Sequence, residues 1–233
     1  MRSLPPSLLC TLLLAVCGSA HAEFYSGTDL KTRLEDWTRN PSVDLVSASL
    51  GAGYVLGVHD ALSGVTVCAP SGITLAQLVD VTLKYMSENP EILNLSADQV
   101  VGRRLKAVWP CGSTYTTFWA GNELKPRLEA WEREDTSNTE RASLGAGYVV
   151  GVFDALSGVS VCSPGGVTVG QVAGVALKFM RANPEVLNLS ADRIVSTSLK
   201  NVWPCKARAS GPPRVAKKQA PKPKGNPTTD SPF

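Results

Sequence analysis

The stretch ASLGAGYVLGVHDALSGVTVC, from Ala48 to Cys68, recurs ninety-four positions later as ASLGAGYVVGVFDALSGVSVC, from Ala142 to Cys162. From Phe24 to Cys111, about 51 of roughly 88 positions match at that offset without a gap, which is typical of an internal repeat. A unit of about ninety residues is long enough to bury a core of its own. The sequence therefore predicts two tandem domains, 23–111 and 118–205, joined by a short linker, 112–117.

The N-terminus has the features of an export signal. Arg2 is followed by an apolar stretch from Leu8 to Val16 and by the small-x-small site Ala20-His21-Ala22. This order predicts a secretory signal peptide over 1–22, cleaved after Ala22. The apolar stretch is too short for a membrane span, which needs about 20 residues. A lipoprotein anchored at Cys17 is the alternative, but the preceding valine stands where such a site needs a small residue.

The mature chain keeps four cysteines, and an even number of cysteines in an exported protein indicates disulfides. Four cysteines permit three pairings, and the repeat favours one bond within each unit, Cys68 with Cys111 and Cys162 with Cys205. Each bond closes a loop of about 43 residues and contributes about 4 kcal/mol in the chain-entropy model. A metal site or a catalytic thiol is disfavoured, because the mature chain has no C-x-x-C motif and a single histidine.

Apolar residues at helical spacing predict an all-α fold with four helices in each unit. In the first unit we expect helices from Leu30 to Trp37, through the repeated stretch to Ser63-Gly64, from Leu75 to about Glu88, and from a Ser96 cap to near Trp109. No alternating pattern is long enough to predict a sheet.

Two glycines, Gly53 and Gly57, lie four residues apart inside the second predicted helix. A glycine in a helix interior costs roughly 0.5–1 kcal/mol relative to alanine, so we expect a reason for both. Close approach of another helix is the reason we favour. The alternative is that Gly51 and Gly53 only loosen the first turn.

The two units differ most in two short segments between their first and second helices. These segments, Arg39 to Ser47 and Arg133 to Arg141, keep their length but lose their similarity. Pro41 in the first segment, and Asp135 to Asn138 in the second, interrupt the helical periodicity. We therefore predict exposed loops at both places.

The last 28 residues, 206–233, form a Pro-, Lys- and Gly-rich tail with the composition of a disordered segment. Seven basic residues against one acid give the tail a charge of +6 and leave the two folded units at about −4. The tail could contact an anionic wall polymer or membrane surface, or be a solvated end. A nucleic-acid partner is disfavoured, because the protein is expected to be exported and its folded units are acidic.

The mature chain shows no residue pattern for catalysis, a cofactor or a metal. His59-Asp60 is the one neighbouring acid–base pair, and the second unit replaces it with Phe153-Asp154. We therefore interpret His59-Asp60 as a polar tip at the end of its helix. The sequence predicts a binding protein rather than an enzyme, with no cofactor and no membrane span.

Four motifs in a fixed order resemble the Rap/Tai family of immunity proteins. They are G-x-x-x-GV-x-D from Gly53 to Asp60, C-x-P-x-G-x-T-x-x-Q from Cys68 to Gln77, N-P-E at Asn89 to Glu91, and W-P-C at Trp109 to Cys111. The resemblance implies a small, helical, disulfide-containing periplasmic protein. It also implies binding to a peptidoglycan amidase effector of a type VI secretion system.

The chain departs from that family, whose members are typically single units that pair as homodimers. The tandem units favour an internal pseudo-dimer, with the glycine-lined helices as a candidate contact, and a homodimer of chains is the alternative. The family binds through variable surface loops, so we expect the two diverged segments to reach the partner. The expected partner-binding residues are Asp44, Ser47, Ser137, Asn138 and Glu140. Two other classes stay open: an acid chaperone of the HdeA-like kind and a wall-associated module that uses the basic tail.

Overall fold

The computed structural model describes residues 23–39, 44–111 and 117–205. The predicted signal peptide with its Ala22 site, most of the linker and the basic tail lie outside these residues. The described chain is all-α, with isolated bridges but no extended strand. The first unit contains α1 (Gly27–Thr38), α2 (Leu45–Leu62), α3 (Leu75–Glu88) and α4 (Ala97–Val108). The second contains α5 (Gly121–Glu132), α6 (Thr139–Leu156), α7 (Val169–Ala182) and α8 (Ala191–Val202), so the predicted fold class is confirmed.

The N-cap side chain caps α1, α2, α3 and α7, whereas α4, α6 and α8 start after Ser96, Asn138 and Ser190 without a side-chain cap. At the start of α3, the Thr74 hydroxyl accepts from the N–H of Gln77, and the Gln77 side chain accepts from the N–H of Thr74. The start of α7 repeats this box. Ser96 stands at the N-cap of α4, but its buried hydroxyl makes no capping hydrogen bond. The predicted hydroxyl cap is therefore wrong. The neighbouring Ala97 N–H instead donates to the Tyr25 carbonyl at 2.9 Å.

The two diverged segments are only partly loops, so the predicted loop boundaries are wrong. α2 begins at Leu45, because the Asp44 carboxylate accepts from the N–H of Ser47 at 2.9 Å and caps the helix. In the second unit, a short 3-10 turn over Thr136–Asn138 leads directly into α6 at Thr139. At Leu45 to Ser47 and at Thr139 to Arg141, the loss of similarity between the two units therefore occurs inside a helix.

One disulfide lies in each unit, with the predicted pairing. Cys68 bonds Cys111 and Cys162 bonds Cys205, with Cα–Cα distances of 4.6 and 4.7 Å. A backbone hydrogen bond of 2.9 Å from the Cys68 N–H to the Trp109 carbonyl runs beside the first bond. The connector after α2 is thereby held to the end of α4, as it is in the second unit between α6 and α8.

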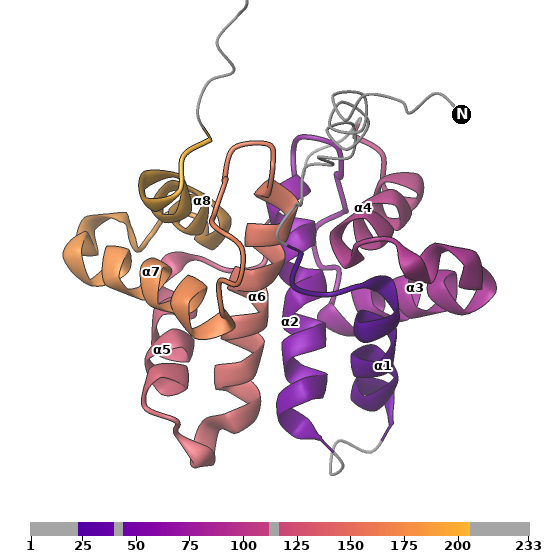
Figure 1. The fold of residues 1–233 in the computed structure, drawn as a ribbon, viewed down its shortest axis with the longest axis horizontal. Helices are drawn as coiled ribbons and strands as arrows, with labels where there is room; N and C mark the ends of the chain where they lie inside the picture. Colours follow the sequence, from indigo (N-terminus) through magenta and orange to yellow (C-terminus); the bar gives the residue numbers. More distant parts are fainter. Residues whose placement is uncertain (1–22, 40–43, 112–116, 206–233) are drawn as a thin grey trace, which may run out of the picture.

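The two units meet along α2 and α6, which lie side by side at the centre of the molecule (Figure 1). Side chains cannot separate the two helices at the glycines, because a Cβ on Gly57 would overlap the backbone of Tyr148, and one on Gly151 would overlap that of Tyr54. Gly53 and Gly147 face the backbones of Leu144 and Leu50 in the same reciprocal way. The predicted close approach is confirmed, and the two units form an internal pseudo-dimer.

The residue numbers of the contacts increase in the same direction along both helices: Gly53 lies against Leu144, and Gly57 lies against Tyr148. The helices α2 and α6 therefore run parallel. Both helices therefore begin at one end of the molecule and finish at the other (Figure 1). By length and composition α2 could cross a membrane, but 72% of it is buried inside the protein, which is typical of a core helix. The large buried side chains at its centre, such as Tyr54 and Leu56, belong to one hydrophobic core that spans both units.

Candidate functional site

Asp154 lies near the C-terminal end of α6 and is 4% exposed. Its carboxylate accepts hydrogen bonds from two groups of the first unit, the Tyr54 hydroxyl at 2.9 Å and the Phe24 N–H at 3.2 and 3.3 Å. Burial removes water from the carboxylate and raises the pKa of Asp154 to about 8. Asp154 therefore ties the second unit to two separate segments of the first.

Asp60 on α2 makes the equivalent contacts to the second unit. It accepts from the Tyr148 hydroxyl at 2.9 Å and from the Phe118 N–H at 3.1 Å, both in the second unit. His59 and Asp60 are 0% and 1% exposed, so the prediction of a polar tip at the helix end is wrong. The carboxylate can be buried because the other unit supplies hydrogen-bond donors, which a sequence read one unit at a time does not reveal.

The two carboxylates differ in their nearest neighbour on the same helix. His59 Nδ1 lies 3.0 Å from an Asp60 oxygen, and the His59 ring packs edge-on against Phe118 with a centroid distance of 5.3 Å. In the second unit Phe153 takes the place of the histidine and packs in the same way against Phe24, also at 5.3 Å. One buried carboxylate therefore has a basic neighbour on its helix, and the other has an aromatic ring.

These buried residues hold the two units together and offer little to a substrate. His59 and Asp60 are enclosed, and the free ring nitrogen of His59, Nε2, has no hydrogen-bond partner among the described residues. In the described part of the chain, no group of three or more His, Cys, Asp or Glu side chains could hold a metal ion. The arrangement supports an interface role for this end of the molecule.

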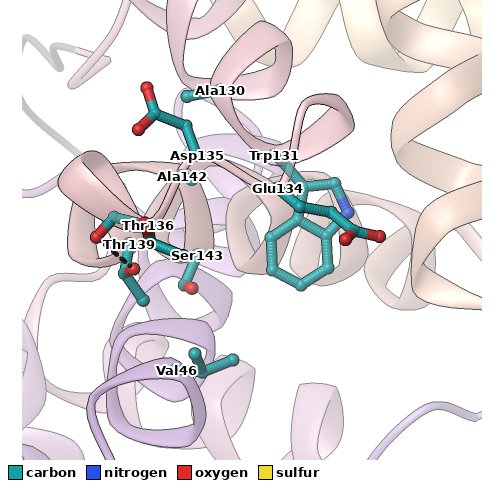
Figure 2. Close-up of a pocket in the computed structure, with 9 residues that line it drawn as sticks. All are labelled: Val46, Ala130, Trp131, Glu134, Asp135, Thr136, Thr139, Ala142 and Ser143. Atoms are coloured by element: carbon teal, nitrogen blue, oxygen red, sulfur yellow. Dashed lines mark hydrogen bonds between the residues drawn. The ribbon is translucent and has the colours of Figure 1, made fainter.

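The opposite end, where α2 and α6 begin, is hollowed by a groove of about 370 Å³. Figure 2 shows the Val46 side chain from α2 across from Trp131 of α5 and Thr139 of α6. Both units therefore contribute to this groove. It is lined by Val46, Ala130, Trp131, Glu134, Asp135, Thr136, Thr139, Ala142 and Ser143.

A second, shallower hollow of about 530 Å³ lies next to the groove and shares Thr136 and Thr139 with it. We call the two together the turn-end surface. The second hollow is lined by Leu45, Thr136, Ser137, Asn138, Thr139, Glu140, Arg141 and Leu144. It also joins the two units, because Leu45 starts α2 and the other residues surround the start of α6.

Hydrogen bonds to Asp135 fix the turn between α5 and α6. The Asp135 carboxylate accepts from the N–H and hydroxyl of Ser137, at 3.0 and 2.6 Å, and from the Asn138 side-chain amide at 2.9 Å. The Ser137 hydroxyl, the largest influence, lowers the pKa of Asp135, because it stabilises the charged form. Glu134 adopts a φ of 52°, which reverses the chain just before Asp135. The turn thus presents its residues in a defined arrangement.

The structure separates the five predicted partner-binding residues into two groups. Ser137, Asn138 and Glu140 line the second hollow. Asp44 and Ser47 line neither hollow: Asp44 caps α2, and the Ser47 hydroxyl accepts from Arg33 Nη1 at 2.8 Å. None of the nine residues that line the groove was among the five, although the two diverged segments include Val46, Glu134, Asp135, Thr136 and Thr139. For Val46 the sequence holds a signal, an apolar residue inside a diverged segment that is predicted to be exposed, and the structure shows its side chain 40% exposed.

Comparison with protein families gives two matches along the chain. Residues 13–111 and 120–205 each match the family model of Rap1a immunity proteins. The chain belongs to this family. Searches among curated proteins and among solved structures gave no match. Two matches in one chain show that the Rap1a domain is present twice, as the internal repeat predicts.

Membership of the Rap1a family supports an immunity-type function directed against a secreted effector protein. Proteins of this family are generally non-enzymatic and are typically exported. The two disulfides fit an oxidising compartment, where such bonds persist. The function of this chain is therefore to be sought in a binding surface.

Proposed function

We propose that this two-domain Rap1a protein is a periplasmic immunity protein that binds and inhibits a peptidoglycan amidase effector of a type VI secretion system. The observation that carries the proposal is the match of both units to the immunity family. The predicted export signal and the two disulfides support a periplasmic location. Export would place the protein where an enzyme that cleaves the cell wall acts.

We assign partner binding to the turn-end surface. The opposite end also has a hollow, of about 610 Å³, but no aromatic side chain among the described residues lines it, whereas the turn-end surface contains an exposed valine beside a tryptophan. Buried aromatic anchors contribute much of the binding energy in protein interfaces. Three acidic residues line the hollows, Glu134, Asp135 and Glu140, against one basic residue, Arg141, so this surface has an acidic edge that suits a partner with basic residues near its own contact.

The proposal is tested by titrating peptidoglycan hydrolysis by a candidate amidase, encoded beside the gene for this chain, with the purified mature protein. We expect inhibition that reaches its limit at a fixed molar ratio. Val46→Asp places a charge in the groove and should weaken inhibition at least about tenfold, as expected for a central interface residue. Val65→Asp is the matched control, because Val65 is 73% exposed at the opposite end of α2.

Two results would contradict the proposal. One is an amidase whose activity is unaffected by the folded wild-type protein. The other is equal inhibition by the Val46 and Val65 variants, which would remove the turn-end surface from the interface and leave amidase binding to be explained by another face.

The acid-chaperone alternative predicts that the folded units loosen at low pH and protect client proteins. In a chain that continues through Ala22, the pKa of Asp154 is raised to about 8, so protonation of this group stabilises the folded state as the pH falls. Client aggregation at about pH 2–3 tests this alternative on the mature protein, and an immunity protein should give no protection there. The wall-associated alternative depends on the basic tail, and peptidoglycan pull-down with and without residues 206–233 tests it.

A further inference from the structure

The peptide nitrogen that begins the mature chain lies close to the buried carboxylate of Asp154. Phe24 donates its N–H to both carboxylate oxygens, at 3.3 and 3.2 Å. Glu23 directly precedes Phe24 and is exposed. Nitrogens of adjacent residues are about 3–4 Å apart, so the Glu23 nitrogen lies within about 7 Å of the carboxylate. The predicted cleavage after Ala22 would turn this nitrogen into the N-terminus of the protein.

The titratable groups around Asp154 are tyrosine hydroxyls and carboxyls. Tyr54 on α2 donates to the carboxylate, Tyr25 lies in the same segment as Phe24, and Asp98 at the start of α4 and the Glu23 side chain add negative charge nearby. Within the described residues, no lysine, arginine or histidine forms an ion pair with Asp154. With the chain continuous through Ala22, this buried carboxyl has no basic partner.

The equivalent carboxylate in the first unit is different, because His59 Nδ1 lies 3.0 Å from Asp60. Phe118 there has the position that Phe24 has at Asp154, and it is preceded by Thr117 within a continuous chain. No cleavage is predicted at that position. Asp60, which lies beside a continuous chain, thus has a basic neighbour from its own helix. Asp154, which lies beside the predicted cleavage site, lacks one.

We propose that removal of the signal peptide creates a functional group: the α-ammonium of Glu23 binds the Asp154 carboxylate and locks the two units together. Hydrolysis of the Ala22–Glu23 peptide bond consumes one water and leaves a carboxylate on Ala22 and an amine on Glu23, which takes up a proton. The inference rests on the predicted export and on cleavage after Ala22. It does not depend on which effector the protein binds.

The new ammonium changes the energetics of the interface between the units. An opposite charge within about 4–6 Å favours the ionised form of a carboxyl, so the pKa of Asp154 falls after processing and that of the α-amine rises. The resulting ion pair joins the start of the first unit to the end of α6 in the second. The interface is therefore tighter in the exported protein than in its precursor.

The experiment compares two chains that both begin at Glu23 and extend to Phe233, one with a free α-amine and one with an Nα-acetyl group introduced by semisynthesis. Carbon-detected NMR follows the Asp154 carboxyl, assigned with the Asp154→Asn variant. We expect the titration midpoint of Asp154 to be lower by about 1 pH unit or more in the free-amine chain. We also expect this chain to unfold at a higher urea concentration at pH 7.

The Asp154→Asn variant provides the control: acetylation should leave its urea midpoint unchanged, since the lock is absent there. Equal Asp154 midpoints in the two chains would overturn the proposal. So would a mass spectrum of the periplasmic protein showing a first residue other than Glu23.

Amidase inhibition by the same two chains separates this inference from the proposed function. Failure of both chains to inhibit, with the expected fall in the Asp154 midpoint, would refute the amidase proposal and uphold the lock. Inhibition with unchanged Asp154 midpoints would refute the lock and uphold the amidase proposal.

Discussion

The two ends of the central α2 and α6 pair differ in sequence and in structure. At the end where both helices finish, the two units share their sequence, each keeps one disulfide, and Asp60 and Asp154 receive hydrogen bonds from the opposite unit. At the end where both helices start, the sequences differ, and the two hollows there are lined partly by these diverged residues.

This difference shows where packing restricts the sequence of a duplicated domain. The glycines at the helix contact must fit the partner unit's backbone, and each buried carboxylate needs its tyrosine donor. Both units therefore keep these glycines, aspartates and tyrosines, although His59 is replaced by Phe153 beside the second carboxylate. Residues around the turn between α5 and α6 contact solvent and can change without loss of the fold. A binding surface can diverge at that end, and variants at each end test the two sides of the comparison.

The largest effect is expected from the disulfides at the shared end. Replacing Cys68 and Cys111 together by serine should lower the free energy of unfolding by about 4 kcal/mol, because the bond restricts a loop of 43 residues in the unfolded chain. The same replacement at Cys162 and Cys205 should cost a similar amount. Urea unfolding under oxidising conditions measures both losses. A loss below about 1 kcal/mol at either site would contradict the stabilising role of that bond.

The next effect comes from the glycine contact. Gly57→Ala should destabilise the protein by about 3 kcal/mol, because the added Cβ meets the Tyr148 backbone, which cannot move aside easily. Gly174→Ala is the matched control: it lies inside α7 with no atom within 4 Å of an added Cβ. It should be neutral or stabilise by up to about 1 kcal/mol through helix propensity. Equal responses of the two variants in thermal and urea unfolding would show that the helices do not meet at Gly57.

Stability should also depend on pH through Asp154 in a chain whose N-terminus extends beyond Glu23. The raised pKa of about 8 means that the contribution is fully present below about pH 4 and is lost as the pH rises to about 8. The slope should be at most about 1.4 kcal/mol per pH unit in that range. Unfolding of the Asp154→Asn variant over the same range supplies the comparison, since the slope due to this group should disappear.

The smallest effect on stability is expected at the turn-end surface. Thr136→Ala and Glu140→Ala alter exposed side chains and should change the free energy of unfolding by no more than about 0.5 kcal/mol. Their effect should appear instead in partner affinity, measured by calorimetry with the amidase that the wild type inhibits. Variants that unfold easily and bind normally would reverse the roles assigned to the two ends.

Much of the fold could be predicted from the sequence, because its signals are local or repeated. Helical spacing and the Thr74 to Gln77 capping box predict the helices, and the repeat reduces three disulfide pairings to one. The glycine pair Gly53 and Gly57 also predicted close helix packing, since glycine in a helix interior needs a reason.

The predictions that failed at the Ser96 cap and at the loop boundaries concern contacts within one unit. Those that failed at the two ends of the central helices depended on contacts between the units. Asp60 looks like an exposed helix end until Tyr148 and the Phe118 N–H are placed beside it from the second unit. Val46 lines the groove only because Trp131 of the second unit lies across from it (Figure 2). Neither neighbour follows from local periodicity, because both depend on how the two units meet.

The central claim is that the glycine faces of α2 and α6 pack against each other within a single chain and so join its two units. Light scattering coupled to size-exclusion chromatography tests it directly on the mature protein across a wide concentration range. We expect the mass of one chain at every concentration. A mass of two chains that Gly57→Ala reduces to one would show that the glycine faces pair between molecules, and would contradict the claim.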